Sequence, residues 1–228
     1  MRSSVPFITI EGVDGAGKSS HMDTLLGALR QAGFDVVATR EPGGTELGQV
    51  LRAQIKTAEM DARTAALIAF ADRQEHLVQK ILPALAEGRA VLSDRFSDSS
   101  YAYQGGGEGC DWEFLKTLER LVQQGLRPDL TLFFDLPTEV AAARRERRKT
   151  ESGTDQPDKF DDKEMAWFDS VRQAYLRRVQ EDPERFVTID ASCDLEHVAG
   201  QVRHAIGQFL HAWKASPSEP RARKSPRP

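Results

Sequence analysis

A glycine-rich segment near the N-terminus combines the residue types and the spacing of a phosphate-binding loop. Residues Gly12–Ser19 read GVDGAGKS and fit the pattern Gly-x4-Gly-Lys-Ser, with an apolar run before them and a helical pattern after them. Glycines let a backbone wrap a phosphate, and the N-terminus of the next helix favours its negative charge. Lys18 can neutralise the β- and γ-phosphate oxygens of a nucleotide, and Ser19 can bind Mg²⁺. We therefore expect a nucleotide-binding loop rather than a chance glycine turn.

A second pair of chemically competent residues follows another apolar run. Asp94 comes directly after Ala90–Ser93, and Arg95 follows it. A carboxylate at the end of a strand more often caps a helix, but beside a phosphate loop it is suited to hold Mg²⁺, directly or through water. The guanidinium fork of Arg95 can bind two oxygens at once, which suits a second ligand that carries a phosphate group.

Two other groups of residues have both a functional and a purely structural explanation. Phe70 and Arg73 lie three residues apart on one helical face, where they could stack on a base and donate to its edge, or be a core ring and a solvated charge. The run Arg144–Lys149 is basic except for Glu146, and the polar segment Thr150–Asp158 follows it. The run is either a solvated helix face or the start of a lid over a bound nucleotide.

These residues are embedded in an alternation of strand-like and helix-like segments. Five strands are expected, at Phe7–Ile10, Asp35–Thr39, Ala90–Ser93, Leu130–Leu136 and Phe186–Ile189. Helices are expected at Ser19–Ala32, Thr45–Lys56, 61–87 with a kink at Pro83, Ser97–Gln104, Trp112–Gln124, Thr138–Lys149, Asp161–Glu181 and Leu195–Trp213, and Gly105–Gly107 is expected to break the chain. This order predicts an α/β fold: a three-layer α/β/α domain with a five-stranded parallel sheet, of the P-loop NTPase type, with a small lid. Ligands bind such sheets beyond the carboxyl ends of the strands, so the glycine loop, Arg40–Gly44 and Asp94-Arg95 should converge.

Composition excludes several classes of protein. The chain has 228 residues and a net charge of −4. Its end, Ala215–Pro228, carries four basic residues against Glu219, so that its charge is +3 and the charge of the rest is −7. An acidic body argues against a protein that binds duplex DNA, and we expect no nucleic-acid partner. The chain contains no asparagine, so the Asn-Lys-x-Asp motif with which Ras-type GTPases read guanine cannot be present.

The sequence also bears on location and domain organisation. The longest apolar runs, such as Leu130–Leu136, are too short to span a membrane, for which about 20 residues are needed. No apolar signal segment stands at the N-terminus, which predicts a cytoplasmic protein without a membrane partner. Two cysteines are too few for a metal cluster or a disulfide framework. We expect one domain over residues 1–214, with the lid at about 144–162, and a disordered basic tail rich in Pro and Ser over 215–228.

Five stretches, in this order, resemble the bacterial thymidylate kinases, a family of P-loop nucleoside monophosphate kinases. They are Phe7–Ser20 (FITIEGVDGAGKSS), Thr39–Gly44 (TREPGG), Phe70–Arg73 (FADR), Asp94–Gly107 (DRFSDSSYAYQGGG) and Arg127–Leu136 (RPDLTLFFDL), and the likeness runs from about residue 5 to residue 213. The resemblance implies transfer of the γ-phosphoryl group of MgATP to dTMP, which gives dTDP for dTTP synthesis. It also implies a homodimer built on the long helices, including 61–87.

The resemblance further implies roles for individual residues. Asp14 would lie near the sugar and phosphate of dTMP, and Arg40 and Arg95 would hold the phosphate. Phe70 would stack on thymine, and Arg73 and Ser100 would contact the edge of that base. Tyr103 would pack against the sugar where a 2′-hydroxyl would sit, with Ser99 and Gln104 in the same pocket. The residues expected to bind ATP are Gly12, Gly15, Ala16, Gly17, Lys18, Ser19, Ser20 and Arg144, and those expected to bind Mg²⁺ are Ser19 and Asp94. The residues expected to be catalytic are Lys18, Arg95, Arg148 and Asp14.

The lid departs from the family pattern, which often reads Asp-Arg-x-Glu where this chain has Asp158–Asp161 (DKFD). The attacking group is already a phosphate oxygen, so catalysis should depend on alignment and charge neutralisation rather than on a strong base. Arg148, one helical turn from Arg144, is the expected lid cation, and Arg144, Arg147 and Lys159 are the next candidates. Arg145 and Lys149 are expected to be solvated.

Two other interpretations stay open on the sequence. Another nucleoside monophosphate kinase or a deoxynucleoside kinase could use the same scaffold, although a deoxynucleoside kinase needs a carboxylate base for its hydroxyl acceptor. A nucleotide-dependent switch without a metabolite acceptor belongs to a different class, and the paired arginines expected at a second pocket speak against it. A panel of acceptors with labelled ATP separates these alternatives.

Overall fold

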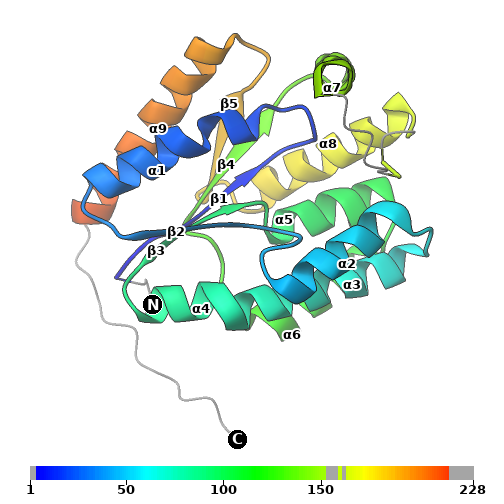
Figure 1. Ribbon diagram of the computed structural model, residues 1–228, viewed down its shortest axis with the longest axis horizontal. Coiled ribbons are helices and arrows are strands. Elements are labelled where there is room, and N and C mark those ends of the chain that lie inside the picture. Colours follow the sequence, from blue (N-terminus) through cyan, green and yellow to red (C-terminus); the bar gives the residue numbers. More distant parts are fainter. Residues whose placement is uncertain (1–3, 153–158, 161–162, 216–228) are drawn as a thin grey trace, which may run out of the picture.

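Five parallel strands form the centre of the fold (Figure 1). In the computed structural model of the chain, residues 4–152, 159–160 and 163–215 are described, without the side chains at 148, 149, 151 and 152. The strands are β1 (Phe7–Glu11), β2 (Val36–Arg40), β3 (Ala90–Asp94), β4 (Leu130–Asp135) and β5 (Phe186–Asp190), and they lie in the order β2-β3-β1-β4-β5. The five-stranded parallel sheet expected from the sequence is confirmed.

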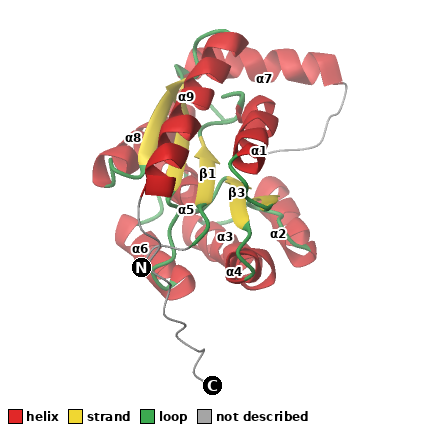
Figure 2. Cartoon of the chain, turned by 90° about the vertical axis from the view of Figure 1, so that its left-hand side faces the viewer, coloured by secondary structure: helices red, strands yellow, loops and turns green. Residues whose placement is uncertain are grey.

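Helices cover both faces of this sheet. They are α1 (Met22–Gln31), α2 (Glu46–Thr57), α3 (Ala62–His76), α4 (Leu82–Ala86), α5 (Ser97–Ser100), α6 (Trp112–Gln123), α7 (Thr138–Ser152), α8 (Met165–Glu181) and α9 (Leu195–Ala215), with a 3₁₀ turn at Lys18–His21. Figures 1 and 2 show α1 and α9 on one face and α3, α4 and α6 on the other, which confirms the three layers. With helices on both faces, strands can be apolar along their whole length, as β1 and β4 nearly are.

The central strands are joined by a buried polar contact as well as by apolar packing. The hydroxyls of Thr9 on β1 and Thr131 on β4 lie 2.8 Å apart and are fully buried. Each hydroxyl therefore has a partner, and the pair can be buried without an unsatisfied polar group. Ile8, Ile10 and Leu132 flank this pair and are also fully buried.

The expectation that Gly105–Gly107 break the chain is wrong. A π-helix continues from α5 over Tyr101–Gly107 and packs along α8. A Cβ on Gly106 would lie 2.5 Å from the carbonyl oxygen of Ser170, and one on Gly107 would lie 2.6 Å from the Trp167 ring. The glycines are needed because α8 approaches too closely for side chains, and not because the helix must end.

The long helical segment expected over 61–87 is present, but it is not a regular α-helix. α3 passes into a π-helix at Leu77–Ile81, and Pro83 lies in the first turn of α4. A proline cannot donate a backbone hydrogen bond, and a change of the bonding pattern just before it accommodates that loss. Asp61 begins the segment as an N-cap, and its carboxylate accepts from the backbone of Arg63 and Thr64.

Several expected boundaries fall at or beyond the edge of the described residues. Most of the expected lid loop, residues 153–158 and 161–162, lies outside them, as does the tail from residue 216. Ala215 itself belongs to α9. In the part of the chain that the structure describes, none of the helices has the length and apolar character needed to cross a membrane.

Candidate active site

The sheet register brings the chemically competent residues to one edge. Asp94 pairs with Ile10 on one side and with Arg40 on the other, so β1, β2 and β3 end together. A cavity of about 690 Å³ lies beyond these ends. The expected site residues that line it are Asp14, Gly15, Gly17, Lys18, Ser19, Ser20, Arg40, Arg73, Asp94, Arg95, Ser99, Ser100, Tyr103, Gln104 and Arg144. Gly12, Ala16 and Phe70 are not among the lining residues, and the side chain of Arg148 is outside the described part.

The phosphate loop is held in a conformation that only glycine adopts readily. Gly12 and Gly15 have φ values of 144° and 90°. A Cβ on Gly12 would lie 2.6 Å from the carbonyl oxygen of Phe134, and one on Gly15 would lie 2.5 Å from that of Ala141. The loop is therefore packed directly on β4 and α7, and both glycines are needed for the approach as well as for the backbone angle.

Lys18 closes this loop on itself. Its ammonium group donates to the carbonyl oxygens of Gly12 and Val13, at 2.9 and 3.1 Å. Burial lowers the pKa of Lys18 to about 8, and the positive charge of Arg95 acts in the same direction. An ammonium group in so little water interacts more strongly with a phosphate than it would on the surface.

Arg95 lines the cavity and is fixed by four side chains. Its Nη1 donates to the hydroxyls of Ser99 (3.1 Å) and Tyr175 (2.9 Å). Its Nη2 donates to Asp14 Oδ1 (2.8 Å) and to the Tyr103 hydroxyl (3.1 Å). Burial alone would raise the pKa of Asp14, but the charges of Arg95 and Lys18 bring it well below its usual value, so this carboxylate is ionised at neutral pH.

Behind Arg95 lies Glu11, for which no role is expected from the sequence. It is fully buried, its Oε1 accepts from the backbone N–H of Phe96 (2.7 Å), and its Oε2 accepts from Ser99 (2.6 Å) and Tyr175 (3.0 Å). Burial, together with the charge of Asp98, raises the pKa of Glu11 to about 7. The only feature of the sequence that marks Glu11 is its position as a carboxylate at the end of a mostly apolar strand. That feature does not predict the hydroxyl groups of Ser99 and Tyr175 that surround it, because they come from distant segments.

Arg73 is supported in the same way on the other side of the cavity. Its Nε donates to Glu41 (2.9 Å) and its Nη2 to Ser100 (3.0 Å), while Nη1 is buried without a partner among the described residues. His76 contacts the other carboxylate oxygen of Glu41 at 2.8 Å and the hydroxyl of Thr39 at 2.6 Å. The unpaired Nη1 is therefore a donor available to a ligand, since a buried donor rarely stays unsatisfied.

Phe70 lies beneath Arg73. The centre of its ring is 4.5 Å from the guanidinium carbon, and the residue is 2% exposed in a cluster with Ala66, Tyr101, Cys110 and Leu115. The described conformation uses the ring as support for Arg73. Stacking of Phe70 on a base stays a prediction.

Comparison with known proteins identifies the family of the chain. The sequence profile described as Thymidylate kinase matches residues 10–202, which is most of the chain. The chain belongs to the thymidylate kinase family. The Thymidylate kinase of Pseudomonas putida (strain GB-1) is 51% identical over 195 residues, which cover 84% of this chain and 90% of the relative. The Thymidylate kinase of Cupriavidus metallidurans (strain CH34) is 50% identical over 192 residues, which cover 84% and 92%. That of Burkholderia thailandensis (strain E264) is 48% identical over 204 residues, which cover 88% and 96%.

The residues of the basic run at the start of the expected lid differ in their surroundings. Arg144 donates to the backbone carbonyls of Ala191 (2.8 Å) and Cys193 (3.3 Å) and also lines the cavity. The expectation that Arg145 is solvated is wrong, because it is 9% exposed and donates to the carbonyl of Asp14 at 2.9 Å. Arg147 lines the cavity.

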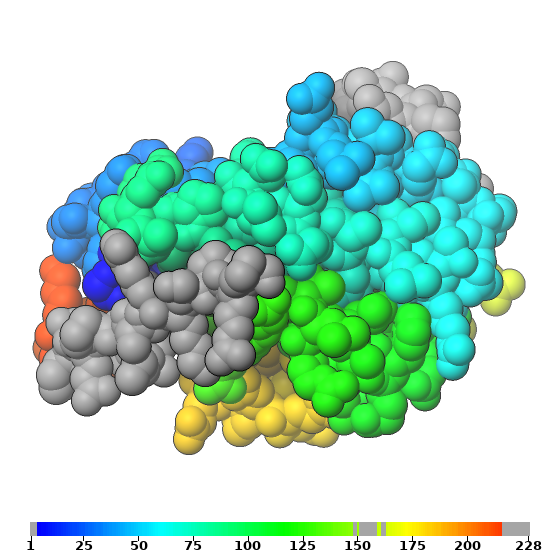
Figure 3. Space-filling model, turned by 90° about the horizontal axis from the view of Figure 1, so that it is seen from below, coloured from blue at the N-terminus to red at the C-terminus, as the bar shows by residue number. Residues whose placement is uncertain are grey.

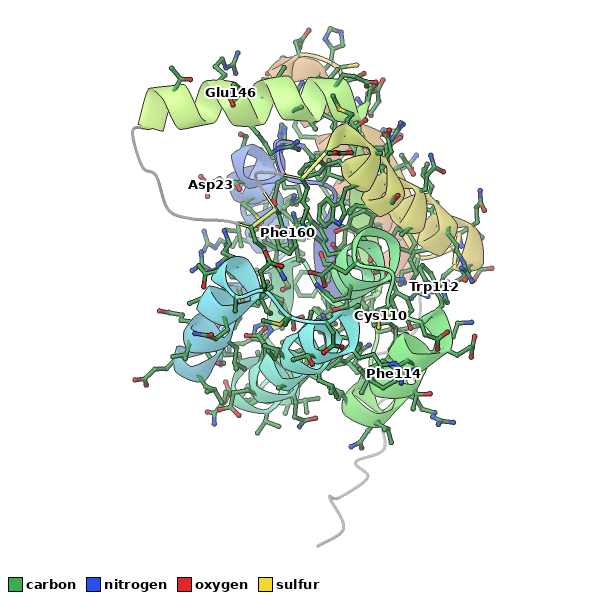
Figure 4. All side chains as sticks on the ribbon, turned by 90° about the vertical axis from the view of Figure 1, so that its right-hand side faces the viewer. Asp23, Cys110, Trp112, Phe114, Glu146 and Phe160 are labelled. Carbon is green, nitrogen blue, oxygen red and sulfur yellow. The ribbon has the colours of Figure 1, made fainter. Side chains whose placement is uncertain are left out.

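The far end of the expected lid is docked on the body of the enzyme. Lys159 and Glu108 form a salt bridge of 2.9 Å, and their side chains are 7% and 12% exposed. The adjacent Phe160 lies in the middle of the view in Figure 4, between α7 and the pair α2 and α3. Its ring contacts those of Tyr103 and Trp167, with centres 5.6 and 5.2 Å apart. Lys159 would have to leave this salt bridge to bind a phosphate, so it is a weaker candidate for the phosphate-binding cation.

The residues expected to hold Mg²⁺ fit that ion. Asp94 Oδ1 is buried without a hydrogen-bond partner in the described part of the chain, and Ser19 lines the same cavity. Mg²⁺ usually keeps several waters and needs only one or two protein oxygens beside those of the phosphates. A carboxylate with an unused oxygen and a nearby hydroxyl meet this requirement.

Proposed function

We propose that the cavity binds dTMP and MgATP side by side and aligns them for direct transfer of the γ-phosphoryl group. As a member of the thymidylate kinase family, the enzyme phosphorylates dTMP to dTDP, with ATP as the phosphate donor, and the product serves dTTP synthesis. The observation that carries the assignment of residues is that the phosphate loop and Arg95 open into one cavity from adjacent strands. Two phosphate-binding groups at one strand edge are the arrangement that such a transfer requires.

The donor would be bound by the phosphate loop. The backbone N–H groups of the loop and the ammonium group of Lys18 would contact the β- and γ-phosphates, and Arg144 would contribute from α7. Ser19 and Asp94 would hold Mg²⁺, which supplies neutralisation of the phosphate charge. Lys18 already lies across the loop, so little rearrangement is needed when the phosphates enter.

The acceptor would lie on the side of Arg95 and Arg73. Arg40 and Arg95 would hold the phosphate of dTMP, and Arg73 Nη1 and Ser100 would contact the edge of thymine, with Phe70 behind them. Tyr103 and Gln104 would line the sugar pocket. The support of Arg73 by Glu41 and Ser100 agrees with this arrangement because it fixes the direction of the free donor.

No general base is needed for a phosphate acceptor, and Glu11 is poorly suited to be one. Its carboxylate is fully buried, is held by three donors, and does not line the cavity. A kinase that phosphorylates a hydroxyl would need a base within hydrogen-bond reach of its acceptor. Glu11 is therefore not the base that a nucleoside kinase would need.

The test is a panel of acceptors with labelled ATP, comprising dTMP, dUMP, dCMP, UMP and thymidine. The expected result is the highest kcat/KM with dTMP and no turnover with thymidine. Turnover of thymidine, or hydrolysis of ATP independent of any acceptor, would contradict the proposal. Removal of divalent cations with excess EDTA should abolish turnover, and added Mg²⁺ should restore it.

A homodimer is part of the proposal. Leu67, Val78, Leu82 and Leu121 are large apolar residues that are 46–63% exposed on α3, the π-helix, α4 and α6. Figure 3 shows these elements side by side on one face of the molecule. An exposed apolar face of this kind is typical of an interface.

Sedimentation should give a dimer, and Leu67→Glu with Val78→Glu should give a monomer. Leu195→Glu on α9, at an equally exposed leucine on another face, is the control. A cytoplasmic location also stays a prediction, to be checked by cell fractionation.

A further inference from the structure

Arg145 occupies an unusual position for a residue in a basic run. It is 9% exposed, although its neighbour Arg144 is half-buried and its neighbour Glu146 is exposed. Its guanidinium carbon lies 3.7 Å from the centre of the Phe168 ring on α8. Its Nη1 donates to the carbonyl oxygen of Asp14 in the phosphate loop at 2.9 Å. Burial of a charge is costly unless specific contacts compensate, so this position is built by the surrounding fold.

The contact with Asp14 bears on how the loop presents its donors. The only cis peptide bond in the described residues is Glu41–Pro42, so the bond between Asp14 and Gly15 is trans. In a trans peptide the C=O and the following N–H point in opposite directions. A carbonyl of Asp14 that is fixed toward Arg145 therefore directs the N–H of Gly15 to the other side. Phosphate loops bind their ligand through N–H groups directed in this way.

Two other carbonyls of the loop are held by a different cation. Those of Gly12 and Val13 accept from Lys18, at 2.9 and 3.1 Å. Lys18 thus fixes the loop through the carbonyls of Gly12 and Val13, and Arg145 fixes it through the carbonyl of Asp14. The loop also packs closely on Arg145, because a Cβ on Gly15 would lie 3.2 Å from the Cγ of Arg145.

We propose that Arg145 is a positioning residue for the phosphate donor. It orients the Asp14–Gly15 peptide so that the N–H of Gly15 faces the donor phosphates, and its stack on Phe168 ties the loop to α7 and α8. Only a planar guanidinium can lie flat on the ring and donate from its edge at once, so lysine is not an adequate substitute. The inference rests on the proposed role of the loop as the donor site.

The test is calorimetric titration of Arg145→Met with ADP and, separately, with dTMP, combined with steady-state kinetics. Methionine keeps the apolar length of the side chain and removes the donor. The expected result is roughly tenfold weaker ADP binding, a KM for ATP raised by a similar factor, and a dTMP affinity within about twofold of the wild type. A matched control is Arg177→Met, since Arg177 also stacks on a ring, that of Trp112 at 4.0 Å, but donates to Glu181 instead of the phosphate loop. It should leave both affinities unchanged.

A lower Tm with unchanged ADP binding in Arg145→Met would overturn the proposal, because it would make Arg145 a purely structural brace. If Arg145→Met does not fold, Arg145→Lys decides the question: about threefold or greater loss of ADP affinity supports the proposal, and wild-type affinity rejects it. Lys18→Met in the same titration reports on the donor site itself. Unchanged ADP binding there would contradict the donor site, whereas a loss in Lys18→Met without one in Arg145→Met would reject only the role of Arg145.

Discussion

Tyr175 of α8 donates a hydrogen bond of 3.0 Å to the carboxylate of Glu11 at the end of β1. The same hydroxyl accepts from Arg95 at 2.9 Å, so it joins a buried carboxylate to a guanidinium that lines the cavity. These residues come from three distant parts of the chain. Their contact explains how a strand, a strand-end loop and a helix from the second half of the sequence together fix one guanidinium.

Loss of this hydroxyl should impair the handling of dTMP. Tyr175→Phe keeps the ring, which stacks on Phe133 with centres 5.2 Å apart. It removes one hydrogen bond to Arg95 and one to Glu11, and the expected effect is a roughly tenfold lower kcat/KM for dTMP with little change in the KM for ATP. Tyr101→Phe is the control, since the hydroxyl of Tyr101 binds Glu119 instead of Arg95. Equal effects of the two substitutions would show that Tyr175 acts only through general stability.

The titration of Glu11 should make stability fall with pH. The folded protein raises the pKa of this carboxyl from 4.5 to about 7, through burial and the charge of Asp98, against the opposing charge of Arg95. The folded state therefore binds more protons than the unfolded state between these values, and the free energy of unfolding decreases as pH rises from 4.5 toward 7. In Glu11→Gln this loss is absent, because an amide does not titrate.

The measurement is urea unfolding of both proteins at pH 5 and pH 8. From pH 5 to pH 8 the free energy of unfolding of the wild type should fall by up to about 3 kcal/mol relative to that of Glu11→Gln, at about 1.4 kcal/mol for each pKa unit. The amide can keep the bond from the Phe96 N–H through its oxygen and can donate to Ser99 or Tyr175 through its nitrogen. A difference between the two proteins that does not vary with pH would show that Glu11 does not titrate in this range.

Much of the site could be predicted from the sequence, because the relevant signals are local. The strand, the loop Gly12–Ser19 and the following helix are contiguous, so the motif and its setting can be recognised together. Asp94 and Arg95 follow a buried strand, and the parallel topology brings all strand ends to one edge. The five strands could be predicted for the same reason, since each is a short apolar run between helices.

The parts that could not be predicted depend on contacts between distant segments. Whether Arg145 is solvated or buried depends on the position of Asp14 and Phe168, which the helical pattern of the run does not contain. Gly105–Gly107 look like a chain break in the sequence, and only the approach of α8 shows why glycine is required inside a helix. Tertiary packing decided both cases against the local signal.

Removal of the loop lysine should abolish turnover without unfolding the protein. Lys18 is 7% exposed, but its partners are carbonyls of its own loop rather than the core. Lys18→Met should lower kcat by about 10³-fold or more, because a charge contact in a closed site contributes several kcal/mol to the transition state. Circular dichroism should show the wild-type spectrum. Turnover close to that of the wild type would reject the phosphate-loop assignment.

Tyr103 is expected to determine the preference for deoxyribose. Its ring is 7% exposed and lines the cavity between Arg95 and Phe160, and its hydroxyl accepts from Arg95. Tyr103→Ala should narrow the ratio of kcat/KM for dTMP over its ribonucleotide counterpart, because space opens where a 2′-hydroxyl would lie. Tyr103→Phe separates the two functions of the residue: it should keep the ratio and lower both values through the lost contact to Arg95. An unchanged ratio in Tyr103→Ala would assign the discrimination to another residue.

The last prediction concerns the cation that meets the transferring phosphoryl group. Negative charge spreads over its equatorial oxygens in the transition state, and the loop residues Gly15 and Ala16 cannot neutralise it. Arg144 and Arg145 hold backbone carbonyls, and Lys159 is paired with Glu108, so each would have to break a contact to take this part.

Arg147 and Arg148 are the next basic residues along α7, and Arg147 lines the cavity. Arg148→Ala and Arg147→Ala are each expected to lower kcat about tenfold or more, with a smaller rise in the KM for dTMP, because the contact would form mainly in the transition state. Arg144→Ala should chiefly raise the KM for ATP, because Arg144 lines the cavity on the proposed donor side. Its bonds to the carbonyls of Ala191 and Cys193 hold it there in the absence of ligand. If both Arg147→Ala and Arg148→Ala keep full kcat, the helix does not supply the cation. The charge would then have to be neutralised by Lys18, Arg95 and Mg²⁺. In that case Arg95→Lys should lower kcat by an unusually large factor in the same kinetic measurements.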